Sequence, residues 1–321
     1  MTSRRTLKLA YAAGLLSTES FILLWRRKKD RFKHKYQAKK FSFEKLSGET
    51  CKDDFRLEKA DIKRLADLLN MPKKFHLASR LIVSSLEVLC IVLRRLSYPG
   101  RLRDLQTFFP RHHTTLSRIF NFGLNWIYEK THHLIDTLQQ PFLTRERMDQ
   151  YAAVIANESG HLSRGMRIFA FIDGTFKQTC RPDKDQRVIY NGKDRHHGLK
   201  YQGITAPDGL ILHLAGPFEG ARHDAYTYLE SSIEDALRAK MEDVGRQFRL
   251  YGDPAYTLSN FLITPFRKAT AQGEIDFNQI MASVRIAVEW SFGKVVQLYA
   301  FNDFRKNLKI DLQPVAKMFI V

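Results

Sequence analysis

Residues 167–175 read RIFAFIDGT, an apolar and aromatic run that ends in Asp173, Gly174 and Thr175. A short run of this kind, bounded by a glycine, predicts a buried strand over residues 167–172. Asp173 is then expected at the carboxyl end of that strand. Ligand sites in α/β proteins form at such strand ends, so Asp173 is the first candidate functional residue.

The segments that follow predict a mixed α/β domain. Residues 200–205 and 210–214 are β-prone and flank Pro207-Asp208-Gly209, which is a good hairpin turn. A helix, two short strands and a long helix are then predicted over residues 224–237, 248–251, 261–264 and about 275–298. The order of three strands, a helix, two strands and a long helix is typical of an α/β layout.

Two further acids accompany Asp173 in this layout. Asp253 follows the predicted strand over residues 248–251, and Glu289 lies on the long helix. Three converging carboxylates would repel one another unless a divalent cation neutralised them, and oxygen donors suit Mg²⁺ or Mn²⁺. Two such metals can activate water and stabilise the leaving oxygen of a phosphodiester.

Each of these acids also has a structural interpretation. Asp253 precedes Pro254 and can simply begin a turn, whereas Glu289 can pair with Arg285 one helical turn earlier. Spacing alone leaves the catalytic and structural interpretations open.

The middle of the chain is predicted to be helical. Apolar residues recur at helical spacing over residues 77–98, and Pro99-Gly100 ends that helix. A short helix around residues 102–108 follows, and Thr114 is expected to cap a third helix. Residues 46–150 are therefore expected to form an all-α domain.

Arg111 and Arg118 lie near the start of this third helix. Three short helices in this order resemble a helix-turn-helix that presents the start of its third helix to a DNA groove. A plain helical bundle with a polar outer side fits the same spacing, and both interpretations stay open here.

The charge of the chain is concentrated at its start. Of 52 Lys and Arg against 34 Asp and Glu, residues 1–40 hold 12 and 2, which is more than half of the net charge of +18. Arg26, Arg27, Lys28 and Lys29 form a cationic run that is typical of nuclear targeting or phosphate contact, although a solvated helix end is an equal alternative. Residues 1–45 are expected to form a basic helix and arm.

Composition excludes several classes of protein. A hydrophobic content of 44% argues against a disordered basic tail protein, and the net charge favours nucleic acid over a membrane surface as partner. Three distant cysteines fit neither a disulfide framework nor a zinc knuckle. Residues 7–25 are interrupted by Lys8 and Glu19, so they predict an amphipathic helix rather than a signal peptide or anchor.

Several motifs in the second half occur together in one family. They are Phe171–Thr175, Tyr190–Lys193, His197–Gln202, Pro207–Gly209, Gly216-Pro217, Arg222–Asp224, Tyr251–Tyr256 and Val284–Lys294. In this order they resemble the DDE superfamily endonuclease domain of PIF/Harbinger-type transposases and their domesticated relatives. The resemblance covers residues 165–321, and residues 93–102 and 116–121 resemble the helical segment of that family.

The resemblance implies a ribonuclease H-like fold in which Asp173, Asp253 and Glu289 form the catalytic, metal-binding triad for Mg²⁺ or Mn²⁺. Asp224 belongs to the same motifs and is either an auxiliary metal ligand or a structural acid at the start of a helix. Lys200 and Arg222 are candidates for holding DNA phosphates. The family also suggests a separate Myb-like partner for sequence-specific DNA binding.

The sequence therefore predicts a nuclear, metal-dependent DNA endonuclease of transposase origin, whose 3′-hydroxyl product could proceed to strand transfer. The alternative is a domesticated nuclear protein that binds DNA or a partner and leaves its nuclease site unused. Relatives usually continue past residues 318–321 into further helical residues, so a truncated copy is also considered.

Overall fold

The computed structural model describes residues 4–21 and 40–321, which belong to two separate units. In the first unit, α1 (Arg4–Ala12) ends just before Gly14, whose φ of 68° does not continue a helix. The single helix expected over residues 7–25 is therefore interrupted: α1 ends at Ala12, residues 18–21 are helical again, and residues 22–25 lie outside the described residues. Within the described ranges, no helix is long and apolar enough to cross a membrane.

The second unit begins with a mostly helical segment. Its elements are η1 (Phe43–Lys45), α3 (Gly48–Phe55), α4 (Lys59–Leu68), β1 (Lys74–Leu77), β2 (Leu81–Ser84), α5 (Ser85–Ser97), η2 (Asp104–Thr107), α6 (His113–Thr131), η3 (His132–Leu134) and α7 (Arg145–Glu158). The expectation of an all-α segment is wrong, because β1 and β2 pair as an antiparallel hairpin.

This hairpin replaces the first third of the helix predicted over residues 77–98. Ser79 and Arg80 adopt left-handed φ values of 64° and 58°, which turn the chain between the two strands. The helix α5 then begins at Ser85, because the Ser84 side chain accepts a hydrogen bond from the Glu87 amide. The predicted end of the helix at Pro99-Gly100 is close to the observed one.

The two helices that follow also differ in detail from the prediction. The short helix around residues 102–108 is the single 3₁₀ turn η2. The third helix, α6, is confirmed, but its N-cap is His112 rather than Thr114, since the His112 ring accepts from the Thr114 amide.

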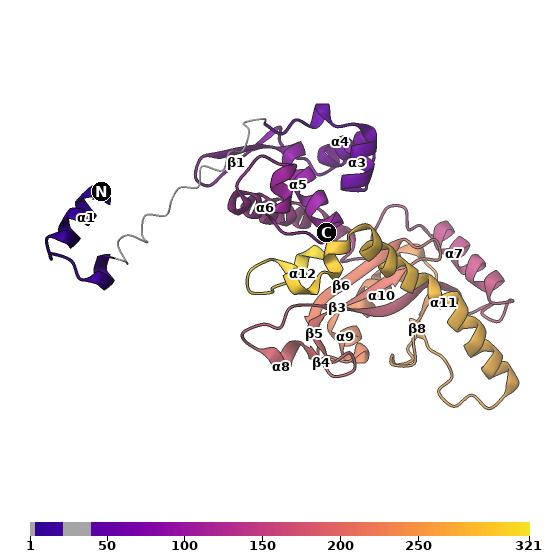
Figure 1. Ribbon diagram of the computed structural model, residues 1–321. Coiled ribbons are helices and arrows are strands. Elements are labelled where there is room, and N and C mark those ends of the chain that lie inside the picture. The colour runs from indigo at the N-terminus through magenta and orange to yellow at the C-terminus, as the bar shows by residue number, and fades with distance from the viewer. Residues whose placement is uncertain (1–3, 22–39) are drawn as a thin grey trace. The chain divides into compact units, whose positions relative to one another are not determined.

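The second half forms a six-stranded mixed sheet with helices around it (Figure 1). Its elements are β3 (Ile168–Gln178), α8 (Gln186–Ile189), β4 (Tyr190–Asn191), β5 (His196–Thr205), β6 (Ile211–Glu219), α9 (Asp224–Glu230), α10 (Ile233–Val244), β7 (Arg249–Tyr251), β8 (Leu262–Ile263), α11 (Gln272–Leu298), η4 (Ala300–Asp303), η5 (Arg305–Asn307) and α12 (Val315–Met318). The strand order is β4-β5-β3-β7-β8, and β6 also pairs with β5. This arrangement confirms a mixed α/β domain.

The pairing of β3 decides where the acids lie. β3 is antiparallel to β5 and parallel to β7, which in turn is parallel to β8. Because β3 pairs with β5 as far as Gln178, the strand continues beyond residue 172. Asp173 therefore lies within β3, and the prediction that it ends the strand is wrong.

One predicted helix is also divided. Residues 224–237 were expected to form a single helix, but the chain bends between α9 and α10 at Ser232, which has a left-handed φ of 51°. The hairpin of β5 and β6, the strand β7 and the long helix α11 lie close to their predicted positions.

Two hydrophobic clusters cover the two faces of the sheet. Phe171, Tyr251 and Phe292 belong to the cluster on the side of α11, whereas Ile172 and Leu237 belong to the cluster on the side of α9 and α10. Successive residues of a regular strand point to opposite faces, so Phe171 and Ile172 lie on different faces of β3. Figure 1 shows α11 running across the sheet.

The cluster on the α11 side continues into the helical segment. Val88 and Leu124, from α5 and α6, belong to the same buried cluster as Phe292 of α11. The Arg95 guanidinium of α5 also lies 4.0 Å from the centre of the Phe301 ring. The helical segment and the sheet thus share the cluster on the α11 side, and the division into 1–45, 46–150 and 165–321 stays a prediction.

Candidate active site

Asp173 is a partly buried carboxylate on the face of β3 that α11 covers. Its antiparallel partner in β5 is Gly203, and a Cβ built on Gly203 would lie 2.7 Å from the Phe292 ring of α11. Paired residues of neighbouring strands point to the same face, so Asp173 faces α11 as well. Its side chain is 18% exposed, and its Oδ1 accepts a hydrogen bond of 2.9 Å from the Gly174 amide.

Asp253 is placed beside Asp173 by the parallel pairing of β3 and β7. Phe171 pairs with Tyr251, and each acid comes two residues after its member of that pair. Oδ1 of Asp253 accepts a hydrogen bond of 2.9 Å from the Ala255 amide, which is the turn role considered from its position before Pro254. The carboxylate of Asp253 also contributes to raising the pKa of Asp173.

Glu289 approaches the same place from α11. Its side chain is 58% exposed, and Oε1 lies 3.5 Å from Nη2 of Arg285, as expected for residues four apart on a helix. Nη1 of the same Arg285 donates a hydrogen bond of 2.9 Å to Oδ2 of Asp173. One guanidinium therefore joins Asp173 and Glu289, which are far apart in the sequence.

The donor chemistry of these acids fits a hard divalent cation, because carboxylate oxygens are the ligands that Mg²⁺ and Mn²⁺ prefer. Burial is the largest cause that raises the pKa of Asp173 to about 6, and the nearby Arg285 opposes it. A buried carboxylate in this condition gains from a nearby cation. Across residues 4–21 and 40–321, however, no three His, Cys, Asp or Glu side chains are grouped closely enough to hold a metal ion.

We expect the pKa of Asp173 to be visible in the stability of the metal-free protein. The folded carboxyl keeps its proton up to about pH 6, whereas its ordinary pKa is 3.8. Between these values the folded state binds more protons, so the free energy of unfolding falls as pH rises, by about 3 kcal/mol in all.

Denaturant unfolding in EDTA at pH 4 and pH 7 measures this decline. Asp173→Asn should decline less than the parent by about 2 kcal/mol over this range, since the asparagine does not titrate and pH 4 already lies above the ordinary pKa. Equal declines in the two proteins would contradict the assignment.

Asp224 lies on the opposite face of the sheet. A Cβ built on Gly174 would lie 3.0 Å from Oδ1 of Asp224, so a side chain at this position would press on the Asp224 carboxylate. Lys200 donates a hydrogen bond of 3.0 Å to the same oxygen. Burial raises the pKa of Tyr256, and the carboxylates of Asp224, Asp173 and Asp253 raise it further. Acids on both faces of the sheet therefore lie close enough to act on the Tyr256 hydroxyl.

The described cations predicted to contact DNA all have partners inside the protein. Lys200 is bonded to Asp224, and Arg222 donates to Glu219. Arg118 donates to the backbone carbonyl of Ala78 at 2.7 Å. Arg26, Arg27, Lys28 and Lys29 lie outside the described residues.

Arg111 is the most firmly held of these cations. Its Nε and Nη2 donate to the two carboxylate oxygens of Glu87 at 2.6 and 2.9 Å, and the Glu87 side chain is nearly buried. This two-pronged contact joins the start of α6 to α5 and holds the guanidinium toward the protein.

We therefore expect Arg111→Ala to lower the free energy of unfolding by about 3 kcal/mol, because it leaves the Glu87 carboxylate buried without a partner. Arg222→Ala is the control, since its pair with Glu219 is exposed and should contribute less than about 1 kcal/mol. Chemical denaturation compares both with the parent. Weakened DNA binding by Arg111→Ala with unchanged stability would show that DNA contact is its main role.

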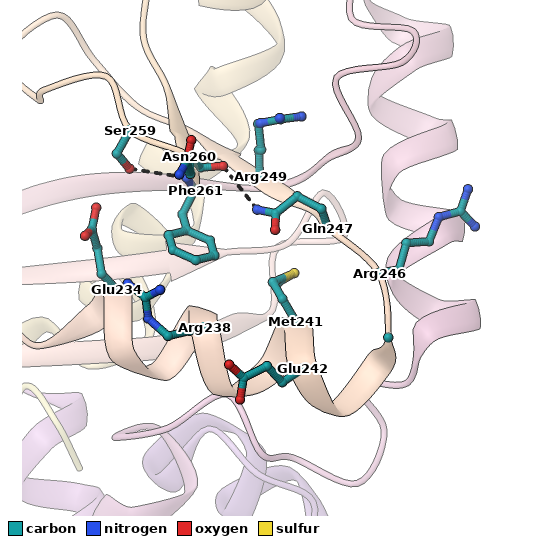
Figure 2. A pocket seen from close by; sticks show the side chains of 11 residues that line it. Glu234, Arg238, Met241, Glu242, Arg246, Gln247, Arg249, Ser259, Asn260 and Phe261 are labelled. Carbon is teal, nitrogen blue, oxygen red and sulfur yellow. Dashed lines mark hydrogen bonds between the residues drawn. The ribbon is translucent and has the colours of Figure 1, made fainter.

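A pocket of about 700 Å³ lies away from these acids, between α10 and the segment that joins β7 to β8 (Figure 2). Acidic and basic residues alternate around it, and Figure 2 shows Arg246 pointing away from the others. Arg246 pairs with Asp149 at 2.9 Å, and Arg249 donates to the carbonyl of Met166. None of the sequence-predicted acids lines this pocket.

Sequence analysis missed one residue that the geometry brings into the site. Arg285 was considered only as a helix partner for Glu289, and its contact with Asp173 links two segments 112 residues apart. The available signal was its position one turn before Glu289 on the same helix.

The fold and the acids together define an α/β domain with a carboxylate site beneath its long helix. Residues 172–321 match the family described as DDE superfamily endonuclease, and this segment contains Asp173, Asp253 and Glu289. Comparison with curated proteins and with solved structures found no match. This match relates residues 172–321 to the endonucleases of the DDE superfamily.

Proposed function

We propose that the chain is a metal-dependent DNA endonuclease of the PIF/Harbinger transposase type, with Asp173, Asp253 and Glu289 as its catalytic acids. The observation that carries this proposal is the contact of one guanidinium, that of Arg285, with both Asp173 of β3 and Glu289 of α11. The register of β3 and β7 aligns the two aspartates, and Arg285 links Asp173 to Glu289. The mixed sheet with a long helix on one face is consistent with a ribonuclease H-like domain.

In this proposal the carboxylates of Asp173, Asp253 and Glu289 would hold Mg²⁺ or Mn²⁺. The bound cations would supply Lewis-acid stabilisation of the phosphodiester and a water of lowered pKa. The buried position of Asp173 provides a surrounding of low polarity in which its charge acts strongly.

The other polar groups serve the site from the opposite face. Asp224 is a structural acid in this proposal, since it accepts a hydrogen bond from Lys200 and lies against Gly174. Holding Gly174 and Lys200 together fixes the backbone of β3 next to Asp173. The role of Lys200 or Arg222 in holding DNA phosphates would require their internal pairs to open.

We further propose a nuclear location, with the cationic run over residues 26–29 as targeting signal or phosphate contact, and a Myb-like protein as partner. The helical segment with Arg111 and Arg118 is proposed as a helix-turn-helix-like accessory domain. Strand transfer by a 3′-hydroxyl product is a further step that an active element would perform.

The second candidate function is a domesticated nuclear protein that binds DNA or a partner without cutting DNA. Two observations favour it: Arg285 already bonds to Asp173, and the described residues contain no preformed group of three metal ligands. Nicking of supercoiled plasmid DNA by the purified full-length protein with Mg²⁺ or Mn²⁺ distinguishes the two functions, because only the endonuclease converts the plasmid to its open form.

A further inference from the structure

Arg285 makes separate contacts with two of the proposed catalytic acids. Nη1 donates to Oδ2 of Asp173 at 2.9 Å, and Nη2 lies 3.5 Å from Oε1 of Glu289. The planar guanidinium suits this arrangement, because its donors form a rigid fork that can serve two carboxylates at once.

The contact with Asp173 is the unusual one of the two. The pair with Glu289 is available to any helix with arginine and glutamate four residues apart. Asp173 belongs to β3, and its contact with Arg285 is enclosed, with the two side chains only 18% and 20% exposed. An ion pair in this position matters because removing one partner leaves the other charge buried and unpaired.

Both oxygens of Asp173 are thus engaged in the metal-free protein. Oδ1 accepts from the Gly174 amide, and Oδ2 accepts from Arg285. Through the Arg285 guanidinium, Oδ2 is also the oxygen that connects Asp173 to Glu289. A cation that binds between these acids would meet the positive charge of Arg285 at the same oxygen.

We propose that Arg285 is a positioning residue that occupies the place of the divalent cation in the metal-free protein and releases Oδ2 of Asp173 when the cation binds. This inference rests on the proposed function. Arg285 holds Asp173 and Glu289 close together against their mutual repulsion, and it competes with the metal for them. The protein therefore binds metal more weakly than its carboxylates alone would allow.

The test compares Mn²⁺ binding to four purified full-length proteins: the parent, Arg285→Gln, Arg285→Lys and Arg246→Gln. Free Mn²⁺ is measured by electron paramagnetic resonance during a titration. Arg246→Gln is the matched control, because Arg246 forms an Arg–Asp pair of the same 2.9 Å length with Asp149, near the separate pocket of Figure 2. Thermal unfolding in EDTA and in Mn²⁺ is recorded for each protein.

We expect Arg285→Gln to bind Mn²⁺ about tenfold more tightly than the parent, because the competing charge-assisted hydrogen bond is gone. Its melting temperature in EDTA should be lower than that of the parent, and Mn²⁺ should raise it by more. Arg285→Lys keeps the positive charge but lacks the forked donors of the guanidinium, and it should bind Mn²⁺ with intermediate affinity. Arg246→Gln should bind Mn²⁺ as the parent does.

Tighter binding separates this role from a merely structural one, since a damaged site would bind metal more weakly. Unchanged or weaker Mn²⁺ binding by Arg285→Gln, while the parent binds, would overturn the inference and leave the proposed function standing. Absence of Mn²⁺ binding in all four proteins would overturn both. If Arg285→Gln does not fold, Arg285→Lys decides alone: affinity equal to or below that of the parent overturns the inference.

Discussion

Replacing Asp173 with alanine should reduce the rate of DNA nicking by about 10³-fold or more. A metal-held catalytic site supplies several kcal/mol of transition-state stabilisation, and each 1.36 kcal/mol corresponds to a tenfold change in rate. The Asp173 side chain is 18% exposed, against 58% for Glu289, and it connects β3 to Arg285 of α11.

The rate is measured as conversion of supercoiled plasmid to the open circle in Mn²⁺. The nicking rates of Asp253→Ala and Glu289→Ala should be reduced to a similar extent. When residues act as one unit, the loss of any one of them removes most of the effect of the whole unit. Asp208→Ala is the control. Asp208 lies in the turn between β5 and β6 and bonds to Arg147 and Tyr151, so the nicking rate should persist. Nicking by Asp173→Ala at the rate of the parent would exclude Asp173 from catalysis.

Replacing Phe171 with alanine should lower the free energy of unfolding by about 3–5 kcal/mol. The Phe171 side chain is fully buried in the cluster between β3 and α11, so its removal leaves a cavity as well as losing apolar contact. Phe171 also precedes Asp173 by two residues on the same face of β3. Its packing against α11 therefore holds the strand that carries Asp173 in place.

Urea denaturation measures the effect, with Phe142→Ala as the control. Phe142 is 45% exposed and should contribute less than about 1 kcal/mol. A loss below about 1 kcal/mol in Phe171→Ala would show that α11 is not held on the sheet by this contact.

Local patterns predicted the parts of the fold that depend on neighbouring residues. The turn at Pro207-Asp208-Gly209 correctly placed a hairpin, because turn residues act within a few positions of themselves. The prediction of the long helix was also correct, since its apolar residues recur at helical spacing over many turns. The hairpin of β1 and β2 was missed because Ile82 fits the helical stripe in sequence, although its side chain is exposed in β2.

The candidate site depends on contacts between residues that are far apart in the sequence. The family motifs predicted Asp173, Asp253 and Glu289, and β3, β7 and α11 bring them toward one region. No spacing rule predicted that β3 would extend past Asp173, because that depends on pairing with β5. The Arg285–Asp173 and Arg111–Glu87 contacts join residues 112 and 24 positions apart, so tertiary packing decides them.

The internal pairs also change the expected source of DNA affinity. Lys200, Arg222, Arg111 and Arg118 were predicted from their residue types, yet each is engaged by a group of the protein itself. A cation that must first break an ion pair contributes less to phosphate binding than a free one. The concentration of charge in residues 1–40 therefore gains importance for any contact with DNA.

The most direct test of the proposed endonuclease is the reaction of the parent protein itself. Purified full-length protein is incubated with supercoiled plasmid in Mn²⁺ or in EDTA, and the nicked product is then offered to a DNA polymerase with labelled nucleotides. We predict nicks only in Mn²⁺, with ends that the polymerase extends because each carries a 3′-hydroxyl. A plasmid that stays supercoiled in Mn²⁺, or equal nicking in EDTA, would contradict a metal-dependent endonuclease.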